Sequence, residues 1–328
     1  LSGLITPSLH EMEEVAKEMQ INKLNIPLII GGATTSEEHT AYYVDPLYDG
    51  AVVHSKDAST NVSIASKLFN DDNYKASIKA KYSELRDKIK NKQTKSVSKA
   101  VNIDWTTEKV YVPTFVGKNV LTDYPIDEII PYINWTAFCA AWKVKGEHAE
   151  RLIEEAECFL NENIIKIKAN AVVAISPVKK ENESIEINGY KFNFVRKDEV
   201  CLTDFLSPNL DYVGLFAATI NVTDLLETLK KSGDDYKAMM LQLLADRLVE
   251  AFSELLHTKM KDEWWGFKNG IRPAIGYPSL PDHSMKREFF ELLDVTNSIG
   301  VTLTETNAMQ PVSSVCGFYF ACDKAKYF

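Results

Sequence analysis

Short apolar runs alternate with helical patterns over residues 1–70, and this alternation narrows the possible folds more than any other feature of the chain. The runs at Leu4-Ile5, 27–30 and 51–54 have the length of buried strands. Between the first two, apolar residues recur every three or four positions, as on one face of a helix. Strands that alternate with helices are typical of a parallel α/β sheet. We therefore expect residues 1–70 to form part of such a sheet.

Two sequences of the form Ser/Thr-x-x-Glu mark expected helix starts. Ser8 is followed by Glu11, and Thr35 is followed by Glu38. Each pair can form a capping box, in which both side chains accept hydrogen bonds from free backbone N–H groups. The second pair follows Gly31-Gly32. Such a turn can expose a helix N-terminus to an anionic ligand, but tight turns also use glycine for conformational reasons alone.

The pattern changes after residue 70. Residues 71–100 carry nine Lys and Arg residues among acids and few apolar residues, which predicts a solvated helix running into a linker, with a domain boundary near residue 95. Beyond residue 101, helical periodicity appears at 147–164 and 234–262. On the second helix, Tyr236, Met239 and Met240 are expected on the apolar face, with the methionines filling the core. Strand-like segments do not alternate regularly with these helices, so the fold class expected here is α+β. These segments are 171–175, 190–195, 212–220, 301–304 and 315–321.

Length and composition exclude several classes of protein. A chain of 328 residues suggests two domains, and it has no apolar stretch near the ~20 residues of a membrane span. The net charge of −9 argues against a nucleic-acid partner. The chain has no initiator Met and no signal-peptide layout, so we expect a cytoplasmic fragment. The five cysteines are an odd number without paired spacing, which predicts neither disulfides nor a zinc site. They are Cys139, Cys158, Cys201, Cys316 and Cys322.

The segment Gly270–Pro278 carries the most informative local pattern. Two prolines and two glycines hold Arg272 and Tyr277 on a stiff, non-helical segment. One interpretation is a surface loop whose Arg makes a salt bridge. The other is a site for S-adenosylmethionine, whose carboxylate suits a guanidinium fork and whose sulfonium suits an aromatic face. An arginine on a rigid loop would bind at a small cost in ordering.

These segments together resemble the carboxy-terminal part of cobalamin-dependent methionine synthases. Residues 2–4 (Ser-x-Leu), twenty-six intervening residues and Gly31-Gly32 resemble part of the cobalamin-binding fingerprint, and GGATTSEEHTA resembles its methionine synthase form. Arg272-x-x-x-Gly-Tyr matches a motif of the activation domain of that family. Further segments follow the family order over essentially the whole chain: 133–136, 202–205, 245–252, 303–305 and 326–328.

The resemblance implies three parts. Residues 1–70 would be the C-terminal part of a cobalamin-binding domain, a partial α/β, Rossmann-like remnant. Residues 71–100 would be a helical, charged linker. Residues 101–328 would be an S-adenosylmethionine-binding activation domain with a mixed or antiparallel sheet. The family's Asp-x-His-x-x-Gly, which supplies the lower cobalt ligand, does not occur in the chain, so this ligand is expected upstream.

The resemblance also assigns site residues by position. Arg272 would bind the methionyl carboxylate, and Glu250 would face the ligand from the long helix. The complete S-adenosylmethionine set is Asn134, Glu250, Arg272, Ala274, Gly276, Tyr277, Tyr327 and Phe328. For cobalamin, hydroxyls would be offered by Ser2 and Thr6, and the nucleotide slot would be lined by Gly31, Gly32 and Ala58. No catalytic residue and no metal ligand is assigned.

Some residues carry a second interpretation or depart from the family pattern. His39 and His54 are expected to be ordinary hydrogen-bonded histidines rather than ligands. Glu250 could instead be a solvent-facing helix acid. Asn134 stands where the family usually has Asp, and the loop before Gly270 is short. Loss of that charge is expected to weaken binding by ~1 kcal/mol, although Asn still accepts a hydrogen bond.

The implied whole enzyme is a methyltransferase that moves a methyl group from methyltetrahydrofolate through cobalamin to homocysteine. This chain would support reductive methylation of cob(II)alamin by S-adenosylmethionine, and would not be catalytically competent alone. Zinc is implied only in the absent homocysteine domain. The implied partners are the upstream domains and flavodoxin or an equivalent electron donor.

Two alternatives stay open. One is a free-standing S-adenosylmethionine-dependent methyltransferase for small molecules, for which Gly31-Gly32 is the only candidate Gly-rich turn. The other is a flavoprotein-docking module without a ligand.

Overall fold

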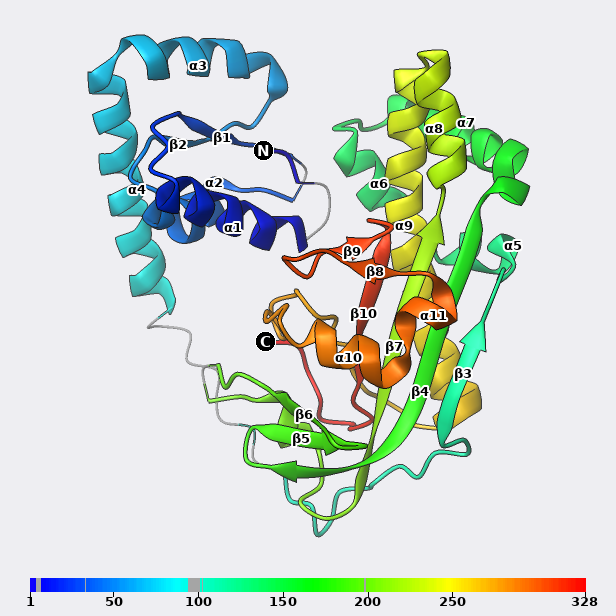
Figure 1. Ribbon diagram of the computed structural model, residues 1–328. Helices are drawn as coiled ribbons and strands as arrows, with labels where there is room; N and C mark the ends of the chain where they lie inside the picture. Colours follow the sequence, from blue (N-terminus) through cyan, green and yellow to red (C-terminus); the bar gives the residue numbers. More distant parts are fainter. Residues whose placement is uncertain (4–6, 33, 94–100, 102, 198) are drawn as a thin grey trace. The chain divides into compact units, whose positions relative to one another are not determined.

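The computed structural model describes residues 1–3, 7–32, 34–93, 101, 103–197 and 199–328. The chain divides into two compact units, Leu1–Val97 and Ser98–Phe328 (Figure 1). Each unit has its own hydrophobic core.

The first unit contains a two-stranded parallel sheet. The strands expected at 27–30 and 51–54 are present as β1 (Leu28–Ile30) and β2 (Val52–His54), whereas Leu4-Ile5 lies outside the described residues. The apolar face of α1 (Pro7–Ile21) shares one core with these strands. The other helical segments are α2 (Glu37–His39), η1 (Thr40–Val44), η2 (Asp45–Leu47), η3 (Ala58–Thr60), α3 (Asn61–Asn70) and α4 (Asp72–Gln93).

Both expected helix starts are displaced. Ser8 lies inside α1, which begins at Pro7, a residue that suits a first turn because it has no N–H to satisfy. At the next start, Ser36 rather than Thr35 is the N-cap, and the Ser36 hydroxyl accepts from the backbone N–H of His39 at 3.0 Å. The Thr35 hydroxyl instead donates to a carbonyl in the preceding turn. Neither predicted capping box forms.

The charged helix α4 contacts α2, α3 and η1 within the first unit. Tyr82 is completely buried, and its hydroxyl accepts from the backbone N–H of His54 at 2.8 Å. Nη1 of Arg86 lies 2.6 Å from Oδ2 of the buried Asp45. The described part of this segment is therefore a largely exposed helix, as predicted, and Tyr82 and ion pairs to Asp45 and Glu37 hold it against the rest of the unit.

A six-stranded antiparallel sheet forms the centre of the second unit. Its strands run in the order β10–β7–β4–β5–β6, and β3 also pairs with β4. Two short strands, β8 and β9, pair separately. The strand bounds are β3 (Gly117–Leu121), β4 (Lys168–Glu181), β5 (Ser184–Ile187), β6 (Tyr190–Asn193), β7 (Asp211–Asn221), β8 (Thr302–Leu303), β9 (Met309–Gln310) and β10 (Ser314–Tyr319).

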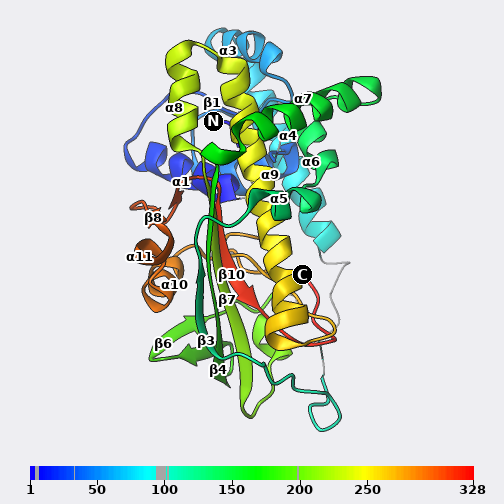
Figure 2. The ribbon, with the colours of Figure 1, turned by 90° about the vertical axis from the view of Figure 1, so that its right-hand side faces the viewer.

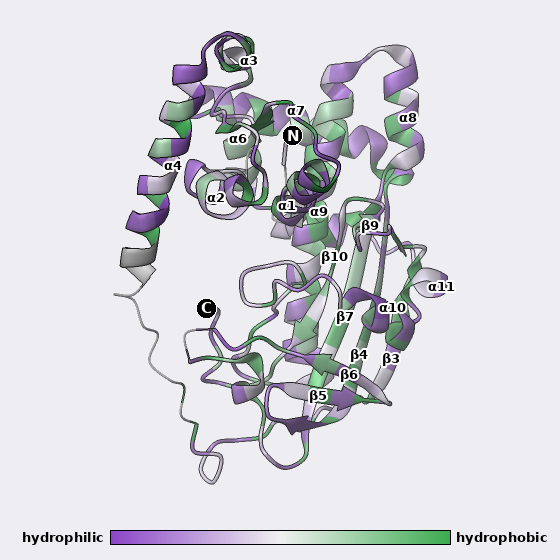
Figure 3. Cartoon of the chain, turned by 60° about the vertical axis from the view of Figure 1, so that its left-hand side comes forward, coloured by the Kyte–Doolittle hydropathy of each residue, from purple (hydrophilic) through white to green (hydrophobic). Residues whose placement is uncertain are grey.

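Helices cover both faces of this sheet. On β4, Ala171 and Val173 belong to the core shared with α9 (Asp235–Lys259), whereas Val172 and Ala174 belong to the core shared with α10 (Lys286–Leu293) and α11 (Val295–Ile299). Figure 2 shows α9 on one side of the strands and α10 and α11 on the other. Because successive strand residues point to opposite faces, both sets must be apolar, as the hydrophobic colouring along β7 in Figure 3 illustrates.

The remaining helices surround α9 or connect the strands. They are α5 (Ile126–Ile129), η4 (Ile130–Tyr132), α6 (Trp135–Ala141), α7 (Glu147–Asn163), η5 (Ile164–Lys166), η6 (Leu202–Phe205), α8 (Thr223–Ser232) and η7 (Met260–Trp265). The predicted α+β class is confirmed for this unit. All five cysteines are free, and in the described parts of the chain no helix is long and apolar enough to cross a membrane.

The start of α9 corrects one expectation about the core. Met240 is 1% exposed, but Met239 is 46% and Tyr236 is 43% exposed. The two exposed residues lie in the first two turns of a 25-residue helix. In the same turns Met240 and Leu241 belong to the core, whereas the Tyr236 ring packs against that of Trp142, with 5.4 Å between the ring centroids.

Candidate ligand-binding site

The segment around Arg272 is tied to the sheet. Ile271 forms an antiparallel bridge with Phe320, and Ala274 forms one with Gly317 of β10. The N–H of Ile275 also donates to a β10 carbonyl at 2.8 Å. The segment therefore lies along the edge of β10 instead of forming a free surface loop, and its side chains have fixed positions.

Gly317 makes this close approach possible. A Cβ atom at this position would lie 2.3 Å from the carbonyl oxygen of Pro273 and 2.7 Å from Cα of Ala274. Only glycine fits without displacing one of the two backbones. Gly317 was not predicted from the sequence, although a glycine inside an apolar strand is a recognised signal of close backbone approach.

A cavity of about 510 Å³ lies between this segment, α9 and the C-terminal residues. Six of the eight residues expected to bind S-adenosylmethionine line it. Three further lining residues were not expected: Pro273, Pro278 and Ser279.

Arg272 is held in place by contacts with neighbouring side chains. Its Nη2 donates to Oε2 of Glu254 at 3.2 Å, and its guanidinium carbon lies 5.4 Å from the ring centroid of Phe216. The side chain is only 12% exposed. Its backbone N–H donates to the hydroxyl of Tyr327 at 2.9 Å. The guanidinium is thus oriented at the cavity wall by contacts outside the cavity.

Glu250 and Tyr277 meet at the cavity wall. The Tyr277 hydroxyl donates to Oε1 of Glu250. Burial and the nearby Glu250 carboxylate raise the pKa of Tyr277, so its hydroxyl keeps its proton. Glu250 is partly buried and lines the cavity. The interpretation of Glu250 as a purely solvent-facing acid is therefore wrong.

His257 lies behind Arg272. Its ring centroid is 5.5 Å from that of Tyr319 and 5.9 Å from that of Phe267. Burial and the Arg272 charge lower the pKa of His257 to about 4. A neutral imidazole at this place lets the guanidinium remain the dominant positive charge near the cavity.

Asn134 and Gly276 do not line the cavity. Asn134 is the N-cap of α6, and its Oδ1 accepts from the backbone N–H of Ala137 at 2.9 Å. Gly276 has φ +95, and a Cβ atom there would lie 2.6 Å from the imidazole of His283. Helix capping and a tight turn account for these two residues without a ligand.

In the first unit, Ser2 forms a parallel bridge with Gly31. Gly32 has φ +110, and a Cβ atom there would lie 2.2 Å from the carbonyl oxygen of Gly3. The chain itself therefore requires glycine at this turn. Ala58 begins η3, and Thr6 lies outside the described residues.

His39 and His54, two of the three histidines of the first unit, have protein partners. Nε2 of His54 lies 3.1 Å from Oγ1 of Thr35. Nε2 of His39 lies 3.4 Å from Oε1 of Glu13. Each imidazole thus has one side-chain partner within the protein.

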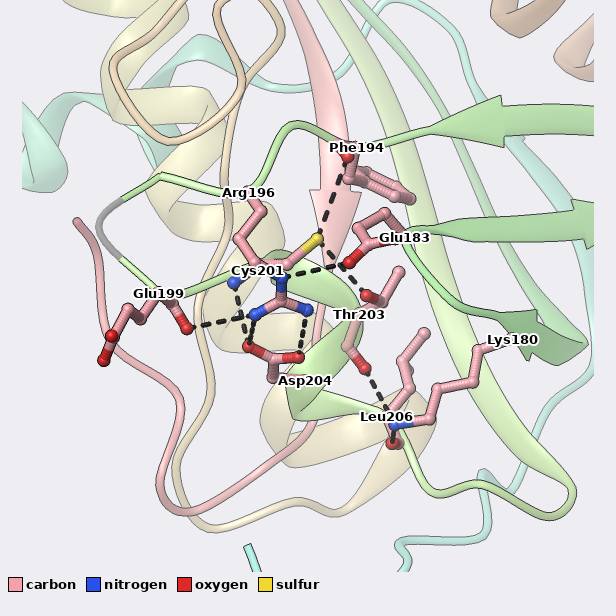
Figure 4. Close-up of polar contacts among 9 residues, drawn as sticks. All are labelled: Lys180, Glu183, Phe194, Arg196, Glu199, Cys201, Thr203, Asp204 and Leu206. Carbon is pink, nitrogen blue, oxygen red and sulfur yellow. Dashed lines mark hydrogen bonds and ion pairs between the residues drawn. The ribbon is translucent and has the colours of Figure 1, made fainter. Parts of the chain in front are cut away.

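A separate polar cluster fixes the segment Leu202–Phe205 (Figure 4). Arg196 donates two hydrogen bonds to the carboxylate of Asp204, at 2.8 and 2.9 Å, and a third to Glu183 at 3.0 Å. Lys180 donates to two carbonyls of the same turn. These hydrogen bonds hold η6 against Lys180 of β4 and Arg196.

The fold and the cavity define the second unit as an α+β ligand-binding module. Residues 125–328 match the activation domain of vitamin B12 dependent methionine synthase. A crystal structure of the MetH reactivation domain bound to AdoHcy superimposes with a TM-score of 0.66 at 30% sequence identity, covering 70% of this chain and 86% of that chain. This chain belongs to the family of vitamin B12 dependent methionine synthase activation domains.

Proposed function

We propose that this chain binds S-adenosylmethionine in the cavity beside α9, as the reactivation module of a methionine synthase. The observation that carries the proposal is Arg272, a guanidinium already oriented at the wall of a cavity of suitable size. Bidentate recognition of a carboxylate is the typical function of such a group. The similar MetH domain was solved with AdoHcy bound, which supports the same class of ligand here.

The remaining residues would contact other parts of the ligand. Glu250, polarised by its hydrogen bond from Tyr277, would face a positively charged or hydroxyl-bearing part. Ala274, Tyr327 and Phe328 would form the walls. Asn134 and Gly276 would act indirectly, through the α6 cap and the turn beside His283. The formal charge missing at Asn134 would then cost little.

We also propose that residues 1–70 are the C-terminal part of a cobalamin-binding domain, with Ser2, Thr6, Gly31, Gly32 and Ala58 near the cofactor. Cobalamin would supply the metal that receives the methyl group. This chain's own contribution would be to bind and orient the methyl donor. The upstream domains and a flavodoxin-like electron donor would be its partners, and the complete enzyme would make methionine from homocysteine.

Calorimetric titration of the full chain with S-adenosylmethionine, AdoHcy and 5′-methylthioadenosine tests the site. The third compound shares the nucleoside but has no carboxylate. Arg272→Ala should weaken binding of the first two about 10- to 100-fold, because a charge-assisted bidentate contact is lost. Binding of 5′-methylthioadenosine should change little.

Arg272→Lys is the matched variant, since it keeps the charge but not the planar guanidinium. Its affinity for S-adenosylmethionine and AdoHcy should lie between those of the unaltered chain and Arg272→Ala. Equal losses for all three compounds would indicate local unfolding instead of a lost carboxylate contact. Unaltered affinity in Arg272→Ala would refute the assigned role of this residue.

A further inference from the structure

The hydroxyl of Ser279 makes two hydrogen bonds to the backbone of a single residue. Oγ of Ser279 donates to the carbonyl oxygen of Phe328 at 2.9 Å and accepts from its N–H at 3.0 Å. Ser279 is 8% exposed and lines the cavity. A hydroxyl is the smallest side-chain group that can donate and accept through one atom.

A second anchor lies at the other end of the same segment. The hydroxyl of Tyr327 accepts from the backbone N–H of Arg272 at 2.9 Å, although Tyr327 as a whole residue is 59% exposed. Residues 327–328 are therefore attached at both ends of the 272–279 segment. Both residues also line the cavity. They form one of its walls, and two side-chain hydroxyls hold this wall in place.

We infer that Ser279 is a positioning residue that latches residues 327–328 onto the 272–279 segment and so retains the ligand in the cavity. The inference rests on the proposed function. Ser279 need not touch the ligand: it acts through Phe328, whose backbone it fixes. Its loss should therefore act mainly on the rate at which the ligand leaves, because a loosened wall opens more often.

The latch itself is measured without a ligand. Hydrogen exchange of the C-terminal peptide in the full chain reports the N–H of Phe328. In Ser279→Ala, exchange should be about 3- to 10-fold faster, since one variant removes both hydrogen bonds. Ser279→Thr keeps a hydroxyl and should restore slow exchange to within about twofold. Ser284→Ala, the same kind of change at an exposed serine, should have no effect.

Ligand retention is measured as the dissociation rate of AdoHcy by stopped flow, with the same three variants. Dissociation should be about 3- to 10-fold faster in Ser279→Ala, with the association rate nearly unchanged and rescue by Ser279→Thr. A merely structural serine would lower thermal stability without this split between the two rates.

Each outcome decides between the claims. Unchanged exchange in Ser279→Ala overturns the latch. Faster exchange with unchanged AdoHcy dissociation overturns its role in retention. If the unaltered chain binds no AdoHcy, the proposed function is wrong and the retention role falls with it, whatever exchange shows for the latch.

Discussion

At the scale of single residues, the Arg272 guanidinium lies at the wall of a largely apolar cavity. Arg272 has Glu254 as its counter-ion and the Phe216 ring beneath it. His257 stands close behind, and a second positive charge there would be repelled by the guanidinium. The folded state therefore favours the neutral imidazole.

This preference predicts a stability change with pH. The pKa of His257 is about 4 in the folded chain against 6.5 in the unfolded chain, so the unfolded chain binds more protons between these values. The stability contribution is fully present above pH 6.5 and is lost as the pH falls from 6.5 to 4. It amounts to at most about 3 kcal/mol. Urea unfolding between pH 7 and pH 4 should show this loss, and His257→Phe should reduce it.

The control is His148→Phe, at an exposed histidine near the start of α7. It should leave the pH dependence unchanged. If His257→Phe has the same pH dependence as the unaltered protein, the imidazole is not held neutral by its surroundings.

Cavity residues that lie close together in the sequence could be predicted, whereas those far apart in the sequence could not. Arg272 and Tyr277 lie within one rigid motif, so their neighbourhood could be inferred locally. Glu254 lies four positions after Glu250, on the same helix face, and that spacing could have indicated it. Ser279 and Phe328 are 49 positions apart. Contacts over such separations depend on the fold and leave no local pattern.

At the scale of elements, the site depends on how closely the 271–275 segment approaches β10. Three features bring them together: the two bridges and the absence of a side chain at Gly317. The rigid loop inferred from the prolines and glycines is therefore rigid for a second reason, its pairing with a strand. The sequence could not show this pairing, because bridges depend on register between distant segments.

Gly317→Ala should damage the site specifically. The added methyl group would overlap the backbone of Pro273, so the segment must move away from β10. We expect a stability loss of about 1–3 kcal/mol by urea unfolding, as for overpacked cores, and weaker AdoHcy binding by calorimetry.

Gly189→Ala provides the comparison. Gly189 has φ +86 in the turn before β6, with nothing within 4 Å of an added Cβ. It should cost about 1 kcal/mol through backbone strain and leave AdoHcy affinity unchanged. Equal affinities for the two variants would contradict the role given to the bridges.

Helices and strands with a strong apolar periodicity were predicted well. Elements whose position depends on contacts with distant segments were not. The long helix at 234–262 and the strands at 171–175 and 212–220 are present. β3 was missed because its residues, Gly117–Leu121, are mostly exposed and show no alternation. The charge pattern of residues 71–93 predicted an exposed helix, whereas the contacts that hold α4, Tyr82 and the ion pairs to Asp45, depend on the fold.

At the scale of the whole molecule, the chain has two units with separate cores, and the cavity residues all come from the second. The cavity lining begins at Glu250 and ends at Phe328. In the first unit, Asp45 holds α4 through Arg86, at 2.6 Å, and Lys79, at 3.4 Å. A substitution at Asp45 should therefore lower the stability of the first unit without changing ligand binding by the second.

Asp45→Asn should lower the stability of the first unit by about 1–3 kcal/mol, because Arg86 loses a buried ionic partner. Calorimetry should show an earlier unfolding transition, and exchange in α4 should be faster. AdoHcy affinity should stay within about twofold, since no cavity residue is touched. Asp49→Asn, the same change at an exposed position nearby, should alter neither property. A tenfold change in AdoHcy affinity in Asp45→Asn would show that the first unit contributes to ligand binding, and the cavity could then not be treated as a property of the second unit alone.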